Sequence, residues 1–487
     1  MFVGVDVGTG GTRAIVIDRA GRVVASEAAE HAPIHSEHIG WAEQDPENWW
    51  QAASTAIAGA VKAAGVTIEA IGLTGQMHGC VMLDASGNVL RPALIWADQR
   101  TQPECDWLTE TIGRERLIEL TCNPALPNFT LTKLLWVKTH QPDIFAKIAQ
   151  VLCPKDYVRY RLTGEFAMDM QEASGTLLLD VANRRWSEEV AGIAGIPLSW
   201  LPNLYEGSEI CAYISETGAA ATGLPVGLPV AAGAGDQGAG AVGMGILASG
   251  SVSATIGTSG VVFAATDKPT MDRLGRLHTF CHAAPDTWHV MGVTNGAGLS
   301  LRYFRDTFAP INSYDELAIL AADAPAGSAG LLWAPYLFGE RTPHLDAEAR
   351  AAFVGITASH TRAHFIRSVM EGVAYSLKDT FTLFEELGIP VQSIRLGGGG
   401  ARGPLWRQIQ ADVYGQPVER LEAEEGGAFG AALLAGTGVG AWPSVAAACE
   451  ATVRAAEVIE PKDKDAMAKG YTMYRRVYPA LREIGRA

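Results

Sequence analysis

Several features that mark other protein classes are missing from this sequence. The seven cysteines are scattered and odd in number, and no two have the C-x-x-C spacing. Neither a disulfide framework nor a structural zinc site is therefore expected. No Gly-Lys-Ser or Gly-Lys-Thr step occurs, which excludes a P-loop nucleotidase.

Positive charge is also scarce. The chain carries 38 basic and 53 acidic residues, a net charge of −15, and its basic residues gather no further than pairs such as Arg475-Arg476. A nucleic-acid partner is not expected, because such proteins show a basic stripe. The least charged stretch, 217–254, is rich in Gly, Ala and Pro and contains Asp236, so no membrane span is predicted. The N-terminus lacks a basic region before an apolar run, so we expect no signal peptide and a cytoplasmic protein.

The sequence is long and apolar enough to form a large hydrophobic core. The 487 residues are 48% hydrophobic, enough for two domains rather than one. We predict domains at 1–247 and 248–487, because each half begins with a strand, a Gly/Thr-rich turn and a second strand. The two turns are Gly8–Thr12 and Gly257–Gly260.

These paired turns indicate a phosphate clamp. Exposed backbone N–H groups beside hydroxyls form a nest for phosphate oxygens. A single such turn is more often only structural, but two of one kind favour a duplicated nucleotide grip. Asp6 stands just before the first turn, and a carboxylate there can hold Mg²⁺ through water.

A short strand at 68–73 delivers the segment Thr74–Cys80, and open α/β sheets bind ligands at the carboxyl ends of their strands. Met77-His78 in this segment could form an apolar wall with a polar cap for a polyol. The alternative is that His78 is simply a satisfied structural residue.

Gly233–Gly238 fits G-x-G-x-x-G, the pattern of a dinucleotide-binding turn. No acidic residue follows about 20 positions later, as that interpretation requires. The alternative is catalytic: Asp236, at a strand-to-helix turn between glycines, accepts a hydroxyl proton during phosphoryl transfer. A plain helix-capping Asp is the structural alternative.

Three further segments complete the pattern. Gly397–Gly400 precedes a predicted helix at 403–415, which suits close backbone approach to a nucleoside. Small residues at 426–432 predict close helix packing beside that pocket. Helices are also predicted at 45–64, after an Asp45 cap with Pro at the first position, and at 464–485.

Taken together, these segments resemble the FGGY family of sugar kinases along essentially the whole chain. Gly75-Gln76-Met77-His78-Gly79 resembles the form that this segment takes in the family members that act on xylulose, and the segment differs in the glycerol kinases. Gln237 stands where close bacterial relatives would carry Asn. The other matching motifs are Asp6-x-Gly8-Thr9-x-x-x-Arg13, the 41–50 segment, Trp96-x-Asp98-x-Arg100, Lys155-Asp156-Tyr157, Gly235-Asp236, Gly257–Gly260, Gly339–Pro343, the 353–371 stretch and Gly397–Arg402.

The resemblance implies an α/β, actin-like ATPase and ribonuclease-H-like fold with two domains around a central cleft. The first domain would bind sugar and the second adenosine, commonly in a homodimer. It further implies ATP and Mg²⁺ as cofactors and transfer of the γ-phosphoryl group to the 5-hydroxyl of D-xylulose. The alternatives are a kinase for another ketose or polyol, such as ribulose, fuculose or glycerol, and a non-catalytic actin-like ATP-binding protein.

The resemblance also assigns roles to individual residues. Asp236 is the expected catalytic base and Asp6 the expected metal ligand. The expected sugar contacts are Met77, His78, Gln237, Trp96 and Asp98. The expected ATP contacts are Gly8, Thr9, Gly11, Thr12, Arg13, Gly257, Thr258, Ser259, Gly398, Gly399 and Arg402.

Overall fold

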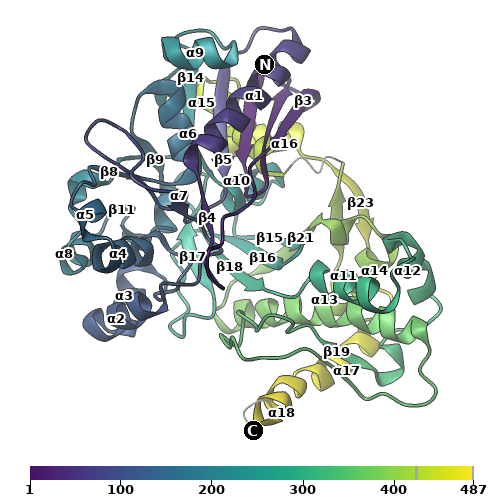
Figure 1. Cartoon of the computed structure of the whole chain (residues 1–487). Coiled ribbons are helices and arrows are strands. Elements are labelled where there is room, and N and C mark those ends of the chain that lie inside the picture. Colours follow the sequence, from purple (N-terminus) through teal and green to yellow (C-terminus); the bar gives the residue numbers. More distant parts are fainter. Residues whose placement is uncertain (423–425, 485–487) are drawn as a thin grey trace.

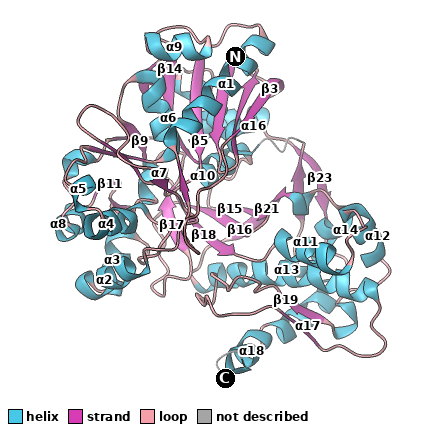
Figure 2. Cartoon of the chain, in the orientation of Figure 1, coloured by secondary structure: helices cyan, strands magenta, loops and turns pink. Residues whose placement is uncertain are grey.

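Two mixed β-sheets organise the computed structural model, which describes residues 1–422 and 426–484 (Figures 1 and 2). The first sheet has the strand order β13-β14-β5-β1-β2-β3, and the second β17-β18-β16-β15-β21-β22-β23. In each, three neighbouring antiparallel strands (β1-β2-β3; β15-β16-β18) lie beside two parallel ones (β5 and β14; β21 and β22). The repeated topology confirms the internal symmetry that the two turns suggested.

The strands that carry the site are mostly buried. β1 (Phe2–Val7) and β5 (Ala70–Gly75) lie at the centre of the first sheet with almost no exposed side chain, as runs of Val, Ile and Leu favour. The other strands of the two main sheets are β2 (Gly11–Ile17), β3 (Val23–Glu30), β13 (Ile210–Tyr213), β14 (Pro229–Gly235), β15 (Gly250–Ile256), β16 (Gly260–Thr266), β17 (His278–Cys281), β18 (Trp288–Thr294), β21 (Val391–Gly398), β22 (Val418–Leu421) and β23 (Ala455–Ile459).

Helices cover both sheets. The predicted helix at 45–64 is α1 (Pro46–Ala64), and Asp45 caps it by accepting from the Glu47 N–H. The predicted 403–415 helix is α14 (Pro404–Tyr414). The remaining longer helices are α2 (Gln102–Ile112), α3 (Arg114–Thr121), α4 (Thr130–His140), α6 (Pro154–Thr163), α10 (Asp236–Gly243), α11 (Gly298–Phe308), α12 (Tyr314–Ala321), α13 (Arg362–Glu386), α15 (Gly426–Gly438) and α16 (Val445–Thr452).

Late in the chain, α15 returns to the first sheet. In Figure 1 the yellow helices α15 and α16 lie beside the purple N-terminal strands. A Cβ at Gly4 would stand 1.8 Å from the Ala428 carbonyl oxygen, and one at Gly430 would stand 1.8 Å from the Ala239 oxygen. Small residues therefore let α15 lie directly against β1 and α10, which confirms the packing role predicted for 426–432. The domain boundary at 247/248 remains a proposal.

The two halves also meet through β17. The Asn123 side chain donates to the Thr279 carbonyl oxygen at 2.8 Å, and the Cys281 N–H donates to Ser174 Oγ at 3.0 Å. Phe280 is fully buried in one apolar cluster with α4 and Met77. An edge strand of the second sheet thus becomes part of the wall around the Met77-His78 segment.

At the C-terminus the structure differs from the prediction of one helix over 464–485. Two helices occur instead, α17 (Lys464–Tyr474) and α18 (Val477–Ile484), and α18 projects from the body in Figure 1. Pro479 explains the break, because its ring has no N–H and clashes with the carbonyl four residues earlier, at Arg475. Residue 485 lies outside the described part of the chain.

Across 1–422 and 426–484, we find no helix with both the length and the apolarity to span a bilayer.

Candidate functional site

The carboxyl ends of β1, β5 and β14 bring the predicted acidic and sugar-facing residues together. In the strand register, Asp6 pairs with Thr74 and Thr74 pairs with Ala234. Asp236 follows β14 at once as the first residue of α10, while Met77 and His78 follow β5. One edge of the first sheet therefore carries both carboxylates and the Met-His segment, as the strand-end rule predicts.

Asp236 is half-buried and lines a cavity of about 290 Å³. Gln237, and Gly397 and Gly398 of the second sheet, line the same cavity. Burial and the neighbouring Asp6 charge raise the pKa of Asp236 to about 7, while hydrogen bonds from Gln237 oppose the shift. A carboxylate with a pKa near neutrality is suited to accept a proton.

Asp6 lies beside this carboxylate. Its Oδ1 is buried and has no hydrogen-bond partner among the described residues, and burial raises its pKa to about 6 against the opposing charge of Arg13. A hard divalent cation would satisfy this orphaned oxygen, because Mg²⁺ prefers one or two carboxylates and water. The residues present therefore fit a magnesium ion at Asp6, next to Asp236.

Met77 packs directly against the end of β14, just before Asp236. A Cβ at Gly235 would stand 2.5 Å from Met77 Cγ, so only glycine admits this contact. Gln171, which sequence reasoning missed, joins the two: its Oε1 accepts from the Gly235 N–H at 2.7 Å and its Nε2 lies 3.5 Å from Met77 Sδ. No motif marks Gln171, because its role arises only from tertiary contact.

His78 is held in one orientation. Its φ is 67°, a left-handed conformation that costs energy for a non-glycine residue. Nδ1 lies 2.7 Å from the Gly175 carbonyl oxygen, and burial lowers the pKa of the ring to about 3. The ring is therefore neutral, Nδ1–H donates to that carbonyl, and Nε2 remains an acceptor. Met77 and His78 line neither the cavity of Asp236 nor the cavity of the Gly257-Thr258 turn, and contact of Nε2 with a sugar hydroxyl remains a prediction.

Arg341 and His278 approach His78 from the second half, and sequence reasoning gave neither a role. The Arg341 charge helps to lower the pKa of both histidines. Glu340 fixes this segment by accepting from the Asn295 and Arg341 N–H groups at 2.8 Å each. The Gly339–Pro343 motif could have signalled a role, but the sequence does not show which side of the molecule it faces.

A second cavity, of about 800 Å³, lies beyond the first. Gly257 and Thr258 line it together with Gly399 and Arg402, and Gly398, the residue before Gly399, lines the cavity of Asp236. A Cβ at Gly398 would stand 2.6 Å from the Ile256 carbonyl oxygen, which explains this glycine. The volume suits a nucleoside polyphosphate.

Basic and aromatic side chains that the sequence did not single out complete this second cavity. Arg302 on α11 donates to Thr258 Oγ1 at 3.0 Å, and the α11 N–H of Gly298 donates to the Gly257 carbonyl at 2.8 Å. Arg305, Tyr314 and Trp406 also line it. Ser259 is exposed on the same turn.

The first turn is tied to its surroundings. The Gly8 N–H donates to the Gly11 carbonyl at 3.0 Å. Thr9 Oγ1 accepts from Trp96 Nε1 at 3.0 Å and donates to Gln76 at 3.3 Å. Two other predicted contacts have partners of their own: Thr12 Oγ1 lies 2.9 Å from His31 Nε2, and Arg13 Nε donates to Ser26 Oγ. Contacts of this turn with ATP remain a prediction.

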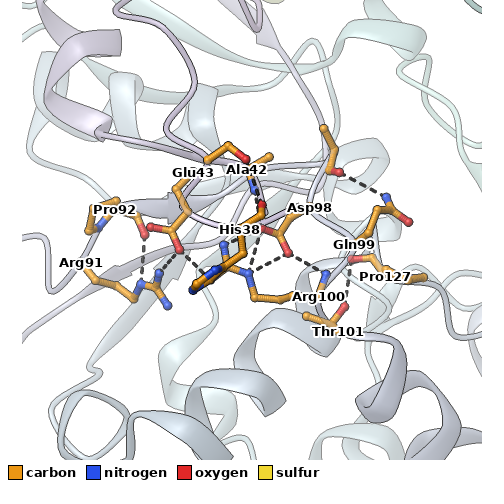
Figure 3. Close-up of polar contacts among 12 residues, drawn as sticks. His38, Ala42, Glu43, Arg91, Pro92, Asp98, Gln99, Arg100, Thr101 and Pro127 are labelled. Carbon is orange, nitrogen blue, oxygen red and sulfur yellow. Dashed lines mark hydrogen bonds and ion pairs between the residues drawn. The ribbon is translucent and has the colours of Figure 1, made fainter. Parts of the chain in front are cut away.

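Asp98 lies in an ion-pair network and lines neither of the two cavities described above. Its carboxylate accepts from the Ala42 N–H at 2.7 Å and pairs with Arg100 at 2.7 Å. Figure 3 shows Arg100 continuing to Glu43, which also binds Arg91. Asp98 is 0% exposed. The structure therefore shows a brace at Asp98, and its contact with sugar remains a prediction.

With this geometry established, similarity to known proteins identifies the class. The N-terminal domain model of the FGGY family of carbohydrate kinases matches residues 1–243, and the C-terminal domain model matches 252–439. The chain belongs to this family of ATP-dependent sugar phosphotransferases.

Particular relatives share the whole length. A xylulose kinase of Bacillus subtilis is 39% identical, with 100% of this chain and 98% of that protein covered. The crystal structure of a xylulose kinase from Rhodospirillum rubrum has a TM-score of 0.93 at 31% identity, covering 100% of both chains. A gluconokinase of Bacillus subtilis is 33% identical over 89% of this chain and 86% of its own. The fold is the actin-like, ribonuclease-H-like one that the sequence predicted.

Proposed function

We propose that this protein transfers the γ-phosphoryl group of ATP to the 5-hydroxyl of D-xylulose. The observation that carries the proposal is the pair of adjoining cavities. Asp236 and Gly398 line one, the Gly257-Thr258 turn and Gly399 line the other, and the two glycines are consecutive in the chain. A phosphate chain running past these glycines would present its terminal group to a hydroxyl held at Asp236.

Four residues at the strand ends of the first sheet have distinct tasks in this mechanism. Asp236 accepts the proton of the attacking hydroxyl as the oxygen–phosphorus bond forms and ADP leaves. His78 Nε2 accepts a second sugar hydroxyl, Met77 provides an apolar wall, and Gln237 orients Asp236 and the sugar. Closure around these groups would exclude water, which otherwise competes as the phosphoryl acceptor.

Asp6 would hold Mg²⁺, whose charge neutralises the phosphate oxygens during transfer. The turns Gly8–Thr12 and Gly257–Ser259 would bind the phosphates through their N–H and hydroxyl groups, and Arg402 would border the adenosine. We further propose a cytoplasmic enzyme that acts as a homodimer and a domain boundary at 247/248.

The test is a coupled assay of ADP release with D-xylulose, D-ribulose, L-fuculose, glycerol and D-gluconate, each compared with no sugar. We expect xylulose to give the highest kcat/KM. A preference for gluconate or glycerol would overturn the substrate while leaving the kinase class intact. Binding of ATP with no release of ADP for any sugar would instead favour the non-catalytic alternative.

A further inference from the structure

A cavity of about 300 Å³ lies in the second half of the chain, between α13, the 336–344 segment and the junction of α17 with α18. None of its lining residues lines either cavity of the cleft. Its polar groups divide into an acceptor-rich floor and a rim that carries arginines. No step of the proposed mechanism uses this site.

The floor contains a buried carboxylate and a chain of hydroxyl groups. Asp379 is 7% exposed, its Oδ1 accepts from Tyr471 at 2.7 Å, and its Oδ2 has no hydrogen-bond partner among the described residues. A buried carboxylate with so few donors is costly. A ligand hydroxyl that donated to it would lower that cost.

The hydroxyl chain runs along the same wall. Tyr474 Oη lies 3.0 Å from Tyr336 Oη, which lies 3.3 Å from His344 Nε2. The His344 ring stacks on Tyr478 at 3.6 Å between centroids, and burial lowers its pKa to about 4. The neutral ring accepts from Tyr336, so the tyrosine oxygens keep lone pairs for donors on a ligand.

The rim has the opposite character. Arg276 is already paired with Asp272 at 3.0 Å and with Glu386 at 3.0 Å. Arg475 is exposed at the mouth and has no ion pair within 4.0 Å among the described residues, but its charge lowers the pKa of the floor carboxylate Asp379, which burial raises to about 7. The first turn of α18 also borders the cavity through Tyr478 and Pro479, and the start of a helix favours an anion.

We propose that this cavity binds a small phosphorylated sugar, with its phosphate at Arg475 and the start of α18 and its hydroxyls on Asp379 and the tyrosines. An anion alone would leave Asp379 Oδ2 without a donor, and a neutral sugar would place no anion at Arg475 and the start of α18. The site stands on its own geometry. One natural ligand would be D-xylulose 5-phosphate, and this choice of sugar rests on the proposed function.

The test is calorimetric titration of the full chain with D-xylulose 5-phosphate and, separately, D-ribose 5-phosphate. The cleft is first saturated with D-xylulose and a non-hydrolysable ATP analogue. We expect one equivalent to bind, with inorganic phosphate and unphosphorylated D-ribose each at least about tenfold weaker, since each satisfies only half of the site. Equal binding of inorganic phosphate would overturn the assignment.

Paired variants locate the binding. Arg475→Gln should weaken it at least about tenfold, whereas Arg476→Gln, an exposed neighbour that does not line the cavity, should not. Asp379→Asn should weaken it as well, and its melting temperature shows whether it folds. If Arg475→Gln and Arg476→Gln bind the sugar phosphates equally, the site is refuted, whatever the sugar preference of the cleft.

Discussion

Asp236 and Asp98 both stand in motifs of the same family, yet their surroundings are opposite. Asp98 is fully buried and saturated by the Ala42 N–H and Arg100. Asp236 is half-buried at a cavity, beside a second carboxylate that repels its charge. A motif thus indicates only that an acidic residue stands at a position. The hydrogen bonds that its carboxylate accepts in the folded structure distinguish an acid that braces the fold from one that is available to a substrate.

The largest effect is expected for Asp236→Asn, which tests whether Asp236 is the catalytic base. We expect kcat to fall by about 10² to 10⁴, since the amide cannot accept the hydroxyl proton. The melting temperature should hold or rise, because a poorly solvated charge is removed. The measurement is sugar-dependent ADP release beside thermal unfolding, and near wild-type turnover would remove Asp236 from the mechanism.

Asp98→Asn should show the reverse pattern. Loss of one partner of a buried ion pair costs about 3–5 kcal/mol, so denaturant unfolding should show a large loss of stability. The KM for sugar of the folded fraction should stay close to that of the wild type. A raised sugar KM at unchanged stability would instead support the predicted sugar contact of Asp98.

The pH dependence of kcat/KM distinguishes Asp236 from His78 within the site. The pKa of Asp236 is raised to about 7 and that of His78 lowered to about 3. The base must be ionised to act, so kcat/KM should fall about tenfold per pH unit below the Asp236 pKa. Bound Mg²⁺ would favour the carboxylate and move this limb toward lower pH.

The control for this prediction is His78→Gln. The variant should retain the acid limb, since His78 is neutral throughout the range from pH 5 to 8. Disappearance of the limb in His78→Gln would mean that the histidine, and not Asp236, is the titrating group. A profile that is flat from pH 5 to 8 in the wild type, even when Mg²⁺ is limiting, would contradict the raised pKa of Asp236.

Local patterns predicted what depends on neighbours in sequence. The strand-turn-strand units, the Asp45 cap and the placing of Asp236 at a strand-to-helix turn were all confirmed. The sequence could not show contacts made across the fold, such as Gln171 between Met77 and Gly235, or Arg341 approaching His78 from the other half. The break in the C-terminal helix was local, and Pro479 could have signalled it.

The same physical limit applies to Asp98 and Trp96. Their common motif gives a spacing of two residues, but no sequence pattern states whether Arg100 or a ligand will occupy a carboxylate. Only the packed structure shows that Trp41 lies under Arg100, 3.6 Å from ring centroid to guanidinium carbon. That contact helps to hold Arg100 against Asp98, while Trp96 stays 39% exposed beside the first turn.

The smallest expected effect therefore concerns Trp96→Phe. Trp96 Nε1 donates to Thr9 Oγ1, which in turn donates to Gln76, so the indole fixes the Thr9 hydroxyl. Loss of one such bond costs about 0.5–1.5 kcal/mol, or about a two- to tenfold fall in kcat/KM. Stability should hardly change, because the side chain is exposed.

A double-mutant cycle tests this route. If Trp96 acts through the Thr9 hydroxyl, Trp96→Phe combined with Thr9→Val should be no worse than Thr9→Val alone. Fully additive losses in kcat/KM would show that Trp96 acts independently of the Thr9 hydroxyl, as a direct contact with the sugar would. The neighbouring motif residue Asp98 would then be the structural member of the pair and Trp96 the substrate-facing one, a division that spacing alone does not reveal.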